Sequence, residues 1–354
     1  MDNKIIIHVS EIDINTNGGM GRVEYYWKTS FEKKGFQFIH IGPNEVGPTH
    51  KWLFPYKAYD YFKKLNIKPA AFIVHEPVSG QFVNKGIPCF LESHGVERRA
   101  WEIFDIKKSI KTKIIFPLWR LRNCDLGLKK ANKLLLINSD DSIYVKKKYK
   151  RKEDDIFLFK NGVDFHDKTL TTRLNDNFTI LFNGSWIERK GIAILIEAAD
   201  ILYKKYNVDF HYLLIGTGKD FSEVQENWPE YLKKNIKVIP KFEATDEIKY
   251  LEKASLFVLP SFFEGQPLSL LQAMSVGICC ITTNSCGQKD IITDDYDGIL
   301  ISAGNSLELS ESIYKCYNDS ETLMRIGNNA KEHMKSRGWE IVSDEVTDFI
   351  IKNI

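Results

Sequence analysis

Short continuous apolar runs alternate with helical stretches along this chain of 354 residues, and the pattern is run through twice. In the first half, strands are expected at 4–10, 37–42, 70–76, 88–95 and 133–141. The pattern resumes with strands expected at 178–184, 211–218, 236–240, 255–260, 278–283 and 298–302. Runs that are apolar throughout, rather than at every second residue, are typical of strands covered on both faces of a parallel sheet. The sequence therefore predicts an α/β protein with two doubly wound domains.

The boundary between the two expected domains follows Asn161-Gly162-Val163-Asp164, where a polar stretch begins. We expect residues 1–165 to form an N-terminal, acceptor-side Rossmann-like domain and residues 166–339 to form a C-terminal one. The last helix, 340–354, is a candidate for crossing back onto the first domain.

Composition excludes a membrane-spanning protein, since no apolar run approaches the ~18–20 residues that a spanning helix needs. The N-terminus has one lysine and a short apolar run followed by acids, which indicates a first strand rather than a signal peptide. We therefore expect a cytoplasmic protein. The six cysteines show no metal-ligand spacing and are expected to be reduced packing residues.

Charge is distributed unevenly along the chain. Residues 1–165 carry 29 Lys and Arg against 19 Asp and Glu, whereas the rest carries 20 against 28. Within the basic half, the region 98–133 combines many bases with aromatic and aliphatic residues, and Pro117 interrupts any single helix there. This suits peripheral docking on an anionic membrane surface, or reception of a lipid-linked or anionic glycan acceptor. The alternative is a charged helical region whose aromatic residues pack among themselves.

The segment EGQPLSLLQAMSVG, residues 264–277, follows the expected strand 255–260. Ligands of open α/β sheets bind beyond the carboxyl ends of the strands. Gly265 allows a close approach of the backbone, and Pro267 is expected in the first helical turn, whose unpaired N–H groups favour a diphosphate. Because a carboxylate repels phosphate, Glu264 is better placed to accept hydrogen bonds from sugar hydroxyls. A capped buried helix with an incidental glutamate is the alternative.

Gln272 lies on the same expected helix, among apolar residues. A side-chain amide in such surroundings needs partners. Either a ribose hydroxyl or a backbone carbonyl would serve.

The longer stretch FFEGQPLSLLQAMSVGICCITTNSCGQKDII, 262–292, resembles the signature of family 4 glycosyltransferases. That family has the GT-B fold, in which two Rossmann-like domains face each other across a cleft. The resemblance implies that Glu264, Gly265, Pro267 and Leu268 contact the donor and that residue 272 meets the nucleotide ribose. The family usually has glutamate at this last position, and Gln272 keeps the hydrogen bonding but loses the charge.

The stretch NGSWIERKGIAILIEAA, 183–199, resembles the family's strand–loop–helix at Gly184, Lys190 and Gly191. Ser185 stands where the family usually has arginine. A departing nucleoside diphosphate gains negative charge, and fixed cations lower that barrier. Lys190 could supply one cation and Arg189 a second. Ordinary solvated charges are the alternative, although cations are disfavoured at a helix N-terminus.

Two motifs of the first half also resemble the family. NGGMGRVEYYW, 17–27, is similar to its N-terminal glycine loop, which implies that Gly19 faces the donor phosphates. His94-Gly95 is similar to the family's His-Gly, which implies that His94 binds a sugar hydroxyl or helps to orient the acceptor. A tight turn and an incidental histidine are the respective alternatives.

The resemblance implies a retaining glycosyltransferase of the hexosyltransferase type, with Glu264, Lys190 and His94 carrying catalysis. It would move a sugar from a UDP- or GDP-sugar to a glycan or lipid-linked acceptor, in bacterial cell-surface polysaccharide assembly. No metal cofactor is expected, because the adjacent acidic pairs 140–141 and 294–295 lack a DxD spacing, and no nucleic-acid module is recognised. A non-catalytic, transferase-like sugar-nucleotide-binding or partner protein is the main alternative, and Ser185 and Gln272 favour it. Another GT-B enzyme, such as an epimerase or a phosphorylase, is a third.

Overall fold

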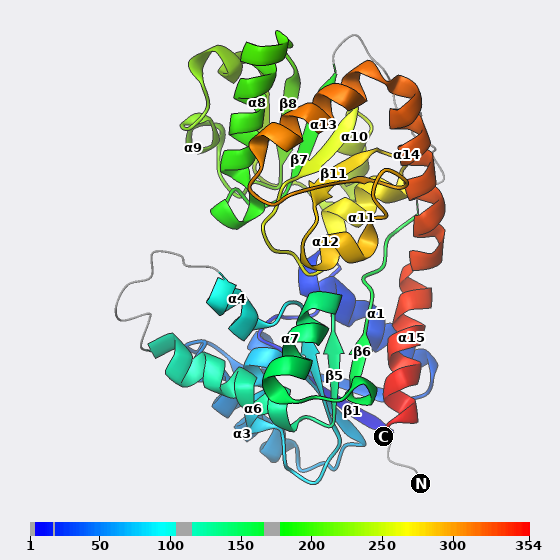
Figure 1. Cartoon of the computed structure of the whole chain (residues 1–354). Coiled ribbons are helices and arrows are strands. Elements are labelled where there is room, and N and C mark those ends of the chain that lie inside the picture. The colour runs from blue at the N-terminus through cyan, green and yellow to red at the C-terminus, as the bar shows by residue number, and fades with distance from the viewer. Residues whose placement is uncertain (1–3, 17, 104–114, 166–177) are drawn as a thin grey trace. The chain divides into compact units, whose positions relative to one another are not determined.

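The computed structural model describes residues 4–16, 18–103, 115–165 and 178–354. It contains two compact units, one formed by Met1–Asn161 with Trp339–Ile354 and the other by Gly162–Gly338 (Figure 1). The division falls four residues before the boundary expected from the sequence, and the return to the first unit begins at Trp339 rather than at residue 340. Among the described residues, every helix is too short or too polar to cross a bilayer.

The first unit is built on six parallel strands in the order β2-β1-β3-β4-β5-β6. These strands are β1 (Ile5–Val9), β2 (Gln37–Ile41), β3 (Ala71–His75), β4 (Cys89–Ser93), β5 (Lys133–Leu136) and β6 (Ile156–Leu158). Every residue of β3 and β4 is buried, as expected of strands in the middle of a sheet with helices on both faces. The edge strand β6 was not expected, because its three residues are only partly covered and give too short an apolar run.

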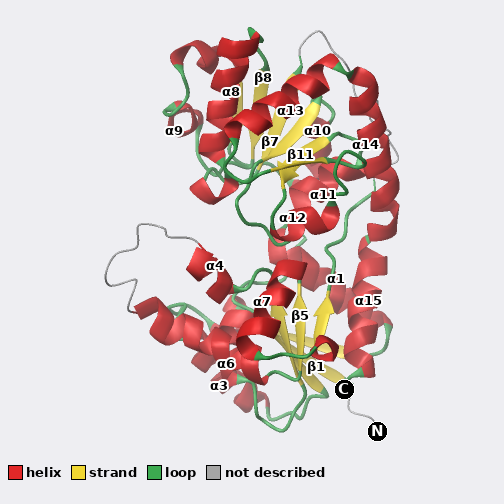
Figure 2. Ribbon diagram, in the orientation of Figure 1, coloured by secondary structure: helices red, strands yellow, loops and turns green. Residues whose placement is uncertain are grey.

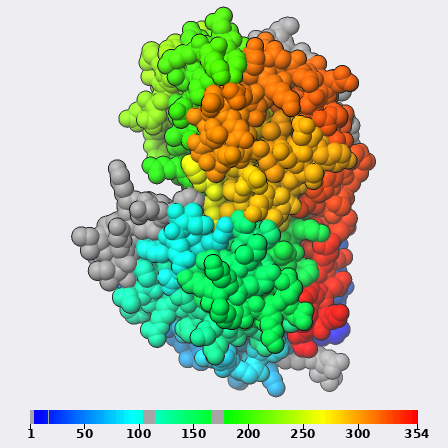
Figure 3. Space-filling model, in the orientation of Figure 1, coloured from blue at the N-terminus to red at the C-terminus, as the bar shows by residue number. Residues whose placement is uncertain are grey.

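Helices cover this sheet (Figure 2). They are α1 (Gly19–Lys33), α2 (Pro43–Val46), α3 (Phe54–Leu65), α4 (Glu97–Ile103), α6 (Arg122–Lys130), α7 (Ser139–Tyr149) and the C-terminal α15 (Trp339–Lys352). Helix α15 packs against α1, where Trp339 stacks on Tyr26 with ring centroids 4.5 Å apart. Lys33 also pairs with Glu340 at 2.6 Å. The other face of α15 is at the surface (Figure 3), where Ile341 is half exposed.

The second unit has six parallel strands in the order β12-β11-β10-β7-β8-β9. They are β7 (Thr179–Asn183), β8 (His211–Ile215), β9 (Ile236–Ile239), β10 (Leu256–Leu259), β11 (Cys280–Thr283) and β12 (Ile299–Ile301). Its helices are α8 (Ile192–Tyr206), α9 (Phe221–Gln225), α10 (Glu247–Leu251), α11 (Leu268–Ser275), α12 (Cys286–Ile291), α13 (Ser306–Asn318) and α14 (Ser320–Met334). The chain starts in the middle of the sheet, builds β8 and β9 on one side, and then returns to build β10, β11 and β12 on the other.

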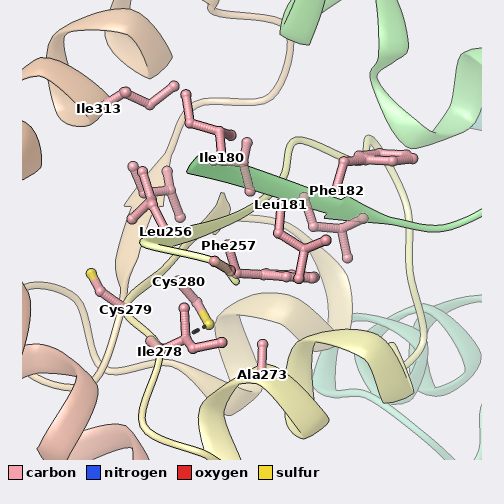
Figure 4. Packing of buried hydrophobic residues seen from close by; sticks show 14 of the residues in the cluster. Ile180, Leu181, Phe182, Leu256, Phe257, Ala273, Ile278, Cys279, Cys280 and Ile313 are labelled. Atoms are coloured by element: carbon pink, nitrogen blue, oxygen red, sulfur yellow. Dashed lines mark hydrogen bonds between the residues drawn. The ribbon is translucent and has the colours of Figure 1, made fainter. Parts of the chain in front are cut away.

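The core of the second unit lies between its sheet and the surrounding helices (Figure 4). β7 and β10 pair in parallel through Leu256 with Ile180 and Phe257 with Leu181, and these four side chains are fully buried. Cys280 is also buried, with its Sγ 3.2 Å from the carbonyl of Ile278. All six cysteines are free and buried, which agrees with their expected packing role. This core fixes the ends of β7 and β10, from which the candidate site emerges.

Candidate active site

The order of strands in the second unit defines where a ligand would bind. The direction of strand addition reverses between β7 and β10, which pair with each other in the middle of the sheet. In open α/β sheets, ligands bind beyond the carboxyl ends of the strands at such a reversal point. The loop after β7 carries Lys190 and the loop after β10 carries Glu264, so the two motifs recognised in the sequence meet at this point.

Backbone geometry brings the two loops together. The loop after β7 ends in a 3-10 turn, Glu188–Lys190, and Gly191 then begins α8 in a left-handed conformation with φ 72°. A Cβ atom at Gly191 would lie 2.0 Å from the carbonyl oxygen of Pro260. Only glycine therefore allows the start of α8 to approach the end of β10 so closely.

Glu264 is the centre of the candidate site. Its side chain is 9% exposed, and its Oε1 lies 2.8 Å from Nζ of Lys190 and 3.0 Å from Nη1 of Arg189. The same Nη1 donates a hydrogen bond to the carbonyl of Phe263 at 2.5 Å. Arg189, whose direction the sequence did not give, thus points toward Glu264. Two cations and one carboxylate converge, and the two cations leave an excess positive charge that suits an anionic group.

The Lys190 side chain lies against Gly184, which belongs to the same loop after β7. A Cβ atom at Gly184 would lie 3.4 Å from Cε of Lys190, so Gly184 provides room for the aliphatic part of that side chain. Lys190 is 12% exposed. Ser185, where arginine was usual in the family, is exposed on the same loop.

The segment after Glu264 is held by α12. The backbone N–H of Gly287 donates to the carbonyl of Glu264 at 3.1 Å, and a Cβ atom at Gly287 would lie 1.3 Å from the carbonyl oxygen of Gly265. Helix α11 begins at Leu268, and Pro267 precedes it with φ −68° and ψ 119°. The expectation that Pro267 lies in the first helical turn was therefore wrong by one residue. Its extended ψ places it at the N-cap, and its carbonyl accepts hydrogen bonds from Leu270 and Leu271.

Gln272 has a protein partner. It is buried on α11, and its Nε2 donates to the backbone carbonyl of Asp164 at 3.1 Å. Of the two partners considered from the sequence, the backbone carbonyl is thus the one present. The amide joins α11 to the segment that leads into the second unit, and a ribose contact stays a prediction.

In the first unit, His94 follows β4 and is held by a buried acid. Its Nε2 lies 2.6 Å from Oε1 of Glu92, and Oε2 of Glu92 lies 3.2 Å from Nε2 of His8. Glu92 is fully buried. Burial alone would raise the pKa of Glu92, but hydrogen bonds from His8 and His94 and their charges outweigh it and hold that pKa well below its usual range. The ionised carboxylate fixes the orientation of the His94 ring.

Sequence reasoning missed Glu92, although a signal was present. A glutamate within the continuous apolar run 88–95 must be buried in a central strand, and a buried carboxylate requires partners. His94, two residues later, was recognised without the residue that orients it.

Gly19 begins α1 with φ 60°, and a Cβ atom there would meet no atom of the described residues within 4 Å. Glycine is therefore needed at this position for the backbone conformation, while the space beside it is open. Whether Gly19 and His94 act on the same ligand as Lys190 and Glu264 stays a prediction.

Comparison with known proteins supports the resemblance that the two motifs carry. Residues 167–333 match the family model described as "Glycosyl transferases group 1", a range that includes Lys190, Glu264 and α11. The match covers most of the second unit of the chain, Gly162–Gly338. The resemblance to family 4 glycosyltransferases is confirmed.

Curated relatives of the chain agree with this match. The chain is 26% identical over 248 residues to the capsular polysaccharide biosynthesis glycosyltransferase CapM of Staphylococcus aureus, covering 67% of this chain and 58% of that protein. It is also 26% identical over 206 residues to a Campylobacter jejuni protein, covering 57% of this chain and 55% of the relative. That relative is named as an alpha-1,4-N-acetyl-D-galactosaminyltransferase acting on a PP-undecaprenol-linked saccharide. The chain spans little more than half the length of these relatives.

Solved structures show the fold. Sucrose-phosphate synthase from Thermosynechococcus elongatus superposes with a TM-score of 0.83 over 99% of both chains, at 16% sequence identity. The GT-B fold, with two Rossmann-like units, is thereby confirmed.

Proposed function

We propose that this protein transfers a sugar from a nucleoside diphospho-sugar to a glycan or lipid-linked acceptor, with retention of configuration. The observation that carries the proposal is the convergence of Lys190 and Arg189 on Glu264, at the reversal point of the second sheet. Relatives named for capsular polysaccharide biosynthesis and for an undecaprenol-linked substrate support the acceptor class.

In this mechanism, the bond between the anomeric carbon and the diphosphate breaks as the acceptor hydroxyl oxygen forms its new bond on the same face of the sugar. The hydroxyl proton passes to the departing phosphate oxygen. Lys190 and Arg189 stabilise the negative charge that develops on the diphosphate, and such fixed charges act most strongly where water is excluded. No metal ion is required in this scheme.

Glu264 has two roles in the proposal. It accepts hydrogen bonds from hydroxyls of the donor sugar, and its carboxylate keeps both cations at the site when no donor is bound. Arrival of a diphosphate supplies a competing anion for Lys190, which frees acceptor capacity on the carboxylate for the sugar. Gly265, Pro267 and Leu268 supply backbone beside the diphosphate, and Gln272 remains a candidate ribose contact through its Oε1.

The test uses the full chain. Isothermal titration with UDP, GDP and their sugar conjugates identifies the donor, and release of nucleoside diphosphate in the presence of lipid-linked saccharides measures turnover. NMR coupling constants at the new anomeric centre report its configuration, and an EDTA control tests the absence of a metal requirement. Donor binding without turnover on any acceptor would instead favour a non-catalytic sugar-nucleotide-binding protein.

We also propose peripheral contact with the cytoplasmic face of the membrane through the region 98–133. Residues 104–114 lie outside the described residues. Arg98 and Arg120 are engaged by carboxylates within the first unit, so they are not free for lipid phosphates. Leu118 and Ile103, which are 60% and 53% exposed, are among the apolar side chains that support the contact. Sedimentation with phosphatidylglycerol vesicles tests it, and absence of binding at low salt would refute it.

A further inference from the structure

The first unit contains a cavity of about 720 Å³, within the range of small-ligand sites. Its walls include Glu11, two residues after β1, and Glu97, four residues after β4. The order of strands reverses between β1 and β3, so the cavity lies where open α/β sheets place their ligands. All of its lining residues belong to the first unit, whereas Lys190 and Glu264 belong to the second.

One wall of the cavity is aromatic. Trp52 and Trp119 are 45% and 44% exposed and meet edge to face, with ring centroids 6.1 Å apart. Phe116 stands beside them and stacks on Trp101 at 4.8 Å. Large aromatic faces that stay half exposed mark surfaces that a ligand covers more often than ordinary surface does. Their apolar faces suit the C–H face of a pyranose ring.

The other wall is polar and rigidly held. Arg120 donates to Glu97 at 2.7 Å and to Glu11 at 2.9 Å. Arg120 itself is only 20% exposed. One guanidinium cannot occupy all the lone pairs of two carboxylates, so acceptor positions remain for hydroxyl donors.

Charge decides between ligand classes. Glu11 and Glu97 are balanced by Arg120 and by Lys51, which also lines the cavity, so no excess positive charge remains there to hold a phosphate, whereas sugar hydroxyls donate readily to carboxylates. Aromatic faces opposite carboxylates therefore match a neutral saccharide better than the diphosphate of a lipid carrier.

We propose that this cavity binds the saccharide of the acceptor, with a sugar ring against Trp52 and Trp119 and its hydroxyls on Glu11 and Glu97. The inference rests on the proposed function, since it deepens the acceptor side of the same reaction. The same aromatic and carboxylate contacts would bind a free glycan or the saccharide of a lipid-linked one.

Saturation-transfer NMR on the full chain tests the binding. The probes are the octyl glycosides of glucose, galactose, N-acetylglucosamine and N-acetylgalactosamine, with octyl phosphate as the anionic counterpart. We expect at least one glycoside to bind and octyl phosphate to bind much more weakly. Trp119→Ala should weaken glycoside binding about tenfold, as loss of a desolvated aromatic contact does, and Trp119→Phe should restore part of it.

The matched control is Phe221→Ala, which removes an equally exposed ring from α9 in the second unit and should leave glycoside binding unchanged. Circular dichroism establishes that the variants are folded. Because both tryptophans are half exposed, their replacement should not unfold the protein. Undecaprenyl-diphosphate-linked sugar in detergent, compared with the free sugar, distinguishes the two sources of the saccharide by their relative affinities.

Three outcomes would overturn the inference. They are that no glycoside binds, that Trp119→Ala binds the glycosides as tightly as the wild type does, or that octyl phosphate binds and the glycosides do not. Titration with UDP and GDP separates this from the proposed function. If neither nucleotide binds, the transferase proposal fails on its own. If one nucleotide binds but the tryptophan variants change nothing, the assignment of the cavity fails alone.

Discussion

Nζ of Lys190 lies 2.8 Å from Oε1 of Glu264, although the two residues come from loops that follow different strands. The pair joins the residue assigned to the diphosphate with the residue assigned to the sugar. Without donor, each side chain neutralises the other and keeps it in place. Three predictions concern this pair and the loops that carry it, and a fourth concerns a buried glutamate of the first unit.

Lys190→Ala should reduce kcat about 100-fold or more, since removing one group that stabilises developing charge has an effect of that size. Nucleotide affinity should fall less, because helix N–H groups and Arg189 remain. Initial-rate kinetics and calorimetry measure the two effects. Lys205→Ala is the control, because Lys205 pairs with Glu311 at the surface; an equal loss in both variants would contradict a role at the site.

Glu264→Gln should lower the affinity for the nucleotide sugar while leaving the affinity for the free nucleoside diphosphate nearly unchanged. Glutamine keeps the shape but loses the charge that holds the sugar hydroxyls and Lys190. Calorimetry on both ligands gives the ratio of the two affinities. A parallel loss for both ligands would show that Glu264 acts on the nucleotide rather than on the sugar.

Gly191→Ala should destabilise the second unit more than Gly218→Ala. Both glycines have a left-handed φ, 72° and 64°, but only a Cβ at Gly191 meets backbone, the Pro260 carbonyl at 2.0 Å. The backbone strain alone costs roughly 1–2 kcal/mol, so the difference in the free energy of unfolding between the two variants isolates the clash. Denaturant unfolding provides the measurement, and equal losses would mean that the loop can move away from β10.

The buried Glu76 should make stability depend on pH. Burial, together with the charge of Glu97, raises the pKa of Glu76 from its usual 4.5 to about 8. The unfolded chain releases this proton near pH 4.5 and the folded chain only near pH 8. Between these values, Glu76 therefore contributes a fall in the free energy of unfolding as pH rises, by at most about 1.4 kcal/mol per pH unit. His40 and His75, whose pKa values are lowered by burial to about 3, contribute the opposite slope up to about pH 6.5.

Glu76→Gln should flatten this decline, as measured by denaturant unfolding between pH 5 and pH 8. Glu24, whose pKa is also raised to about 8 by burial, contributes a slope of the same sign, so the variant reduces the decline without abolishing it. Glu311→Gln, at an exposed acid, is the control. An unchanged slope in Glu76→Gln would show that Glu76 is ionised in the folded protein at neutral pH.

Local sequence determined the elements of this protein and the identity of its two main loops. Continuous apolar runs identify buried parallel strands, and Pro267 marks the start of α11 to within one residue. The need for glycine at position 191 also comes from the carbonyl of Pro260, which is distant in the sequence. The three-residue strand β6 was not predicted, because its apolar run is too short to be distinguished from a loop.

Tertiary structure alone decided which of these residues meet. The contact between Lys190 and Glu264 depends on the pairing of β7 with β10. Local sequence patterns do not determine the order of strands in a sheet. The same holds for Gln272, whose buried amide donates to the Asp164 carbonyl. It also holds for Glu92 on β4, which joins His94 to His8 on β1, a strand separated from β4 by β3. A polar residue within an apolar run predicts that the buried group has a hydrogen-bond partner, but the packing of distant segments determines which group that partner is.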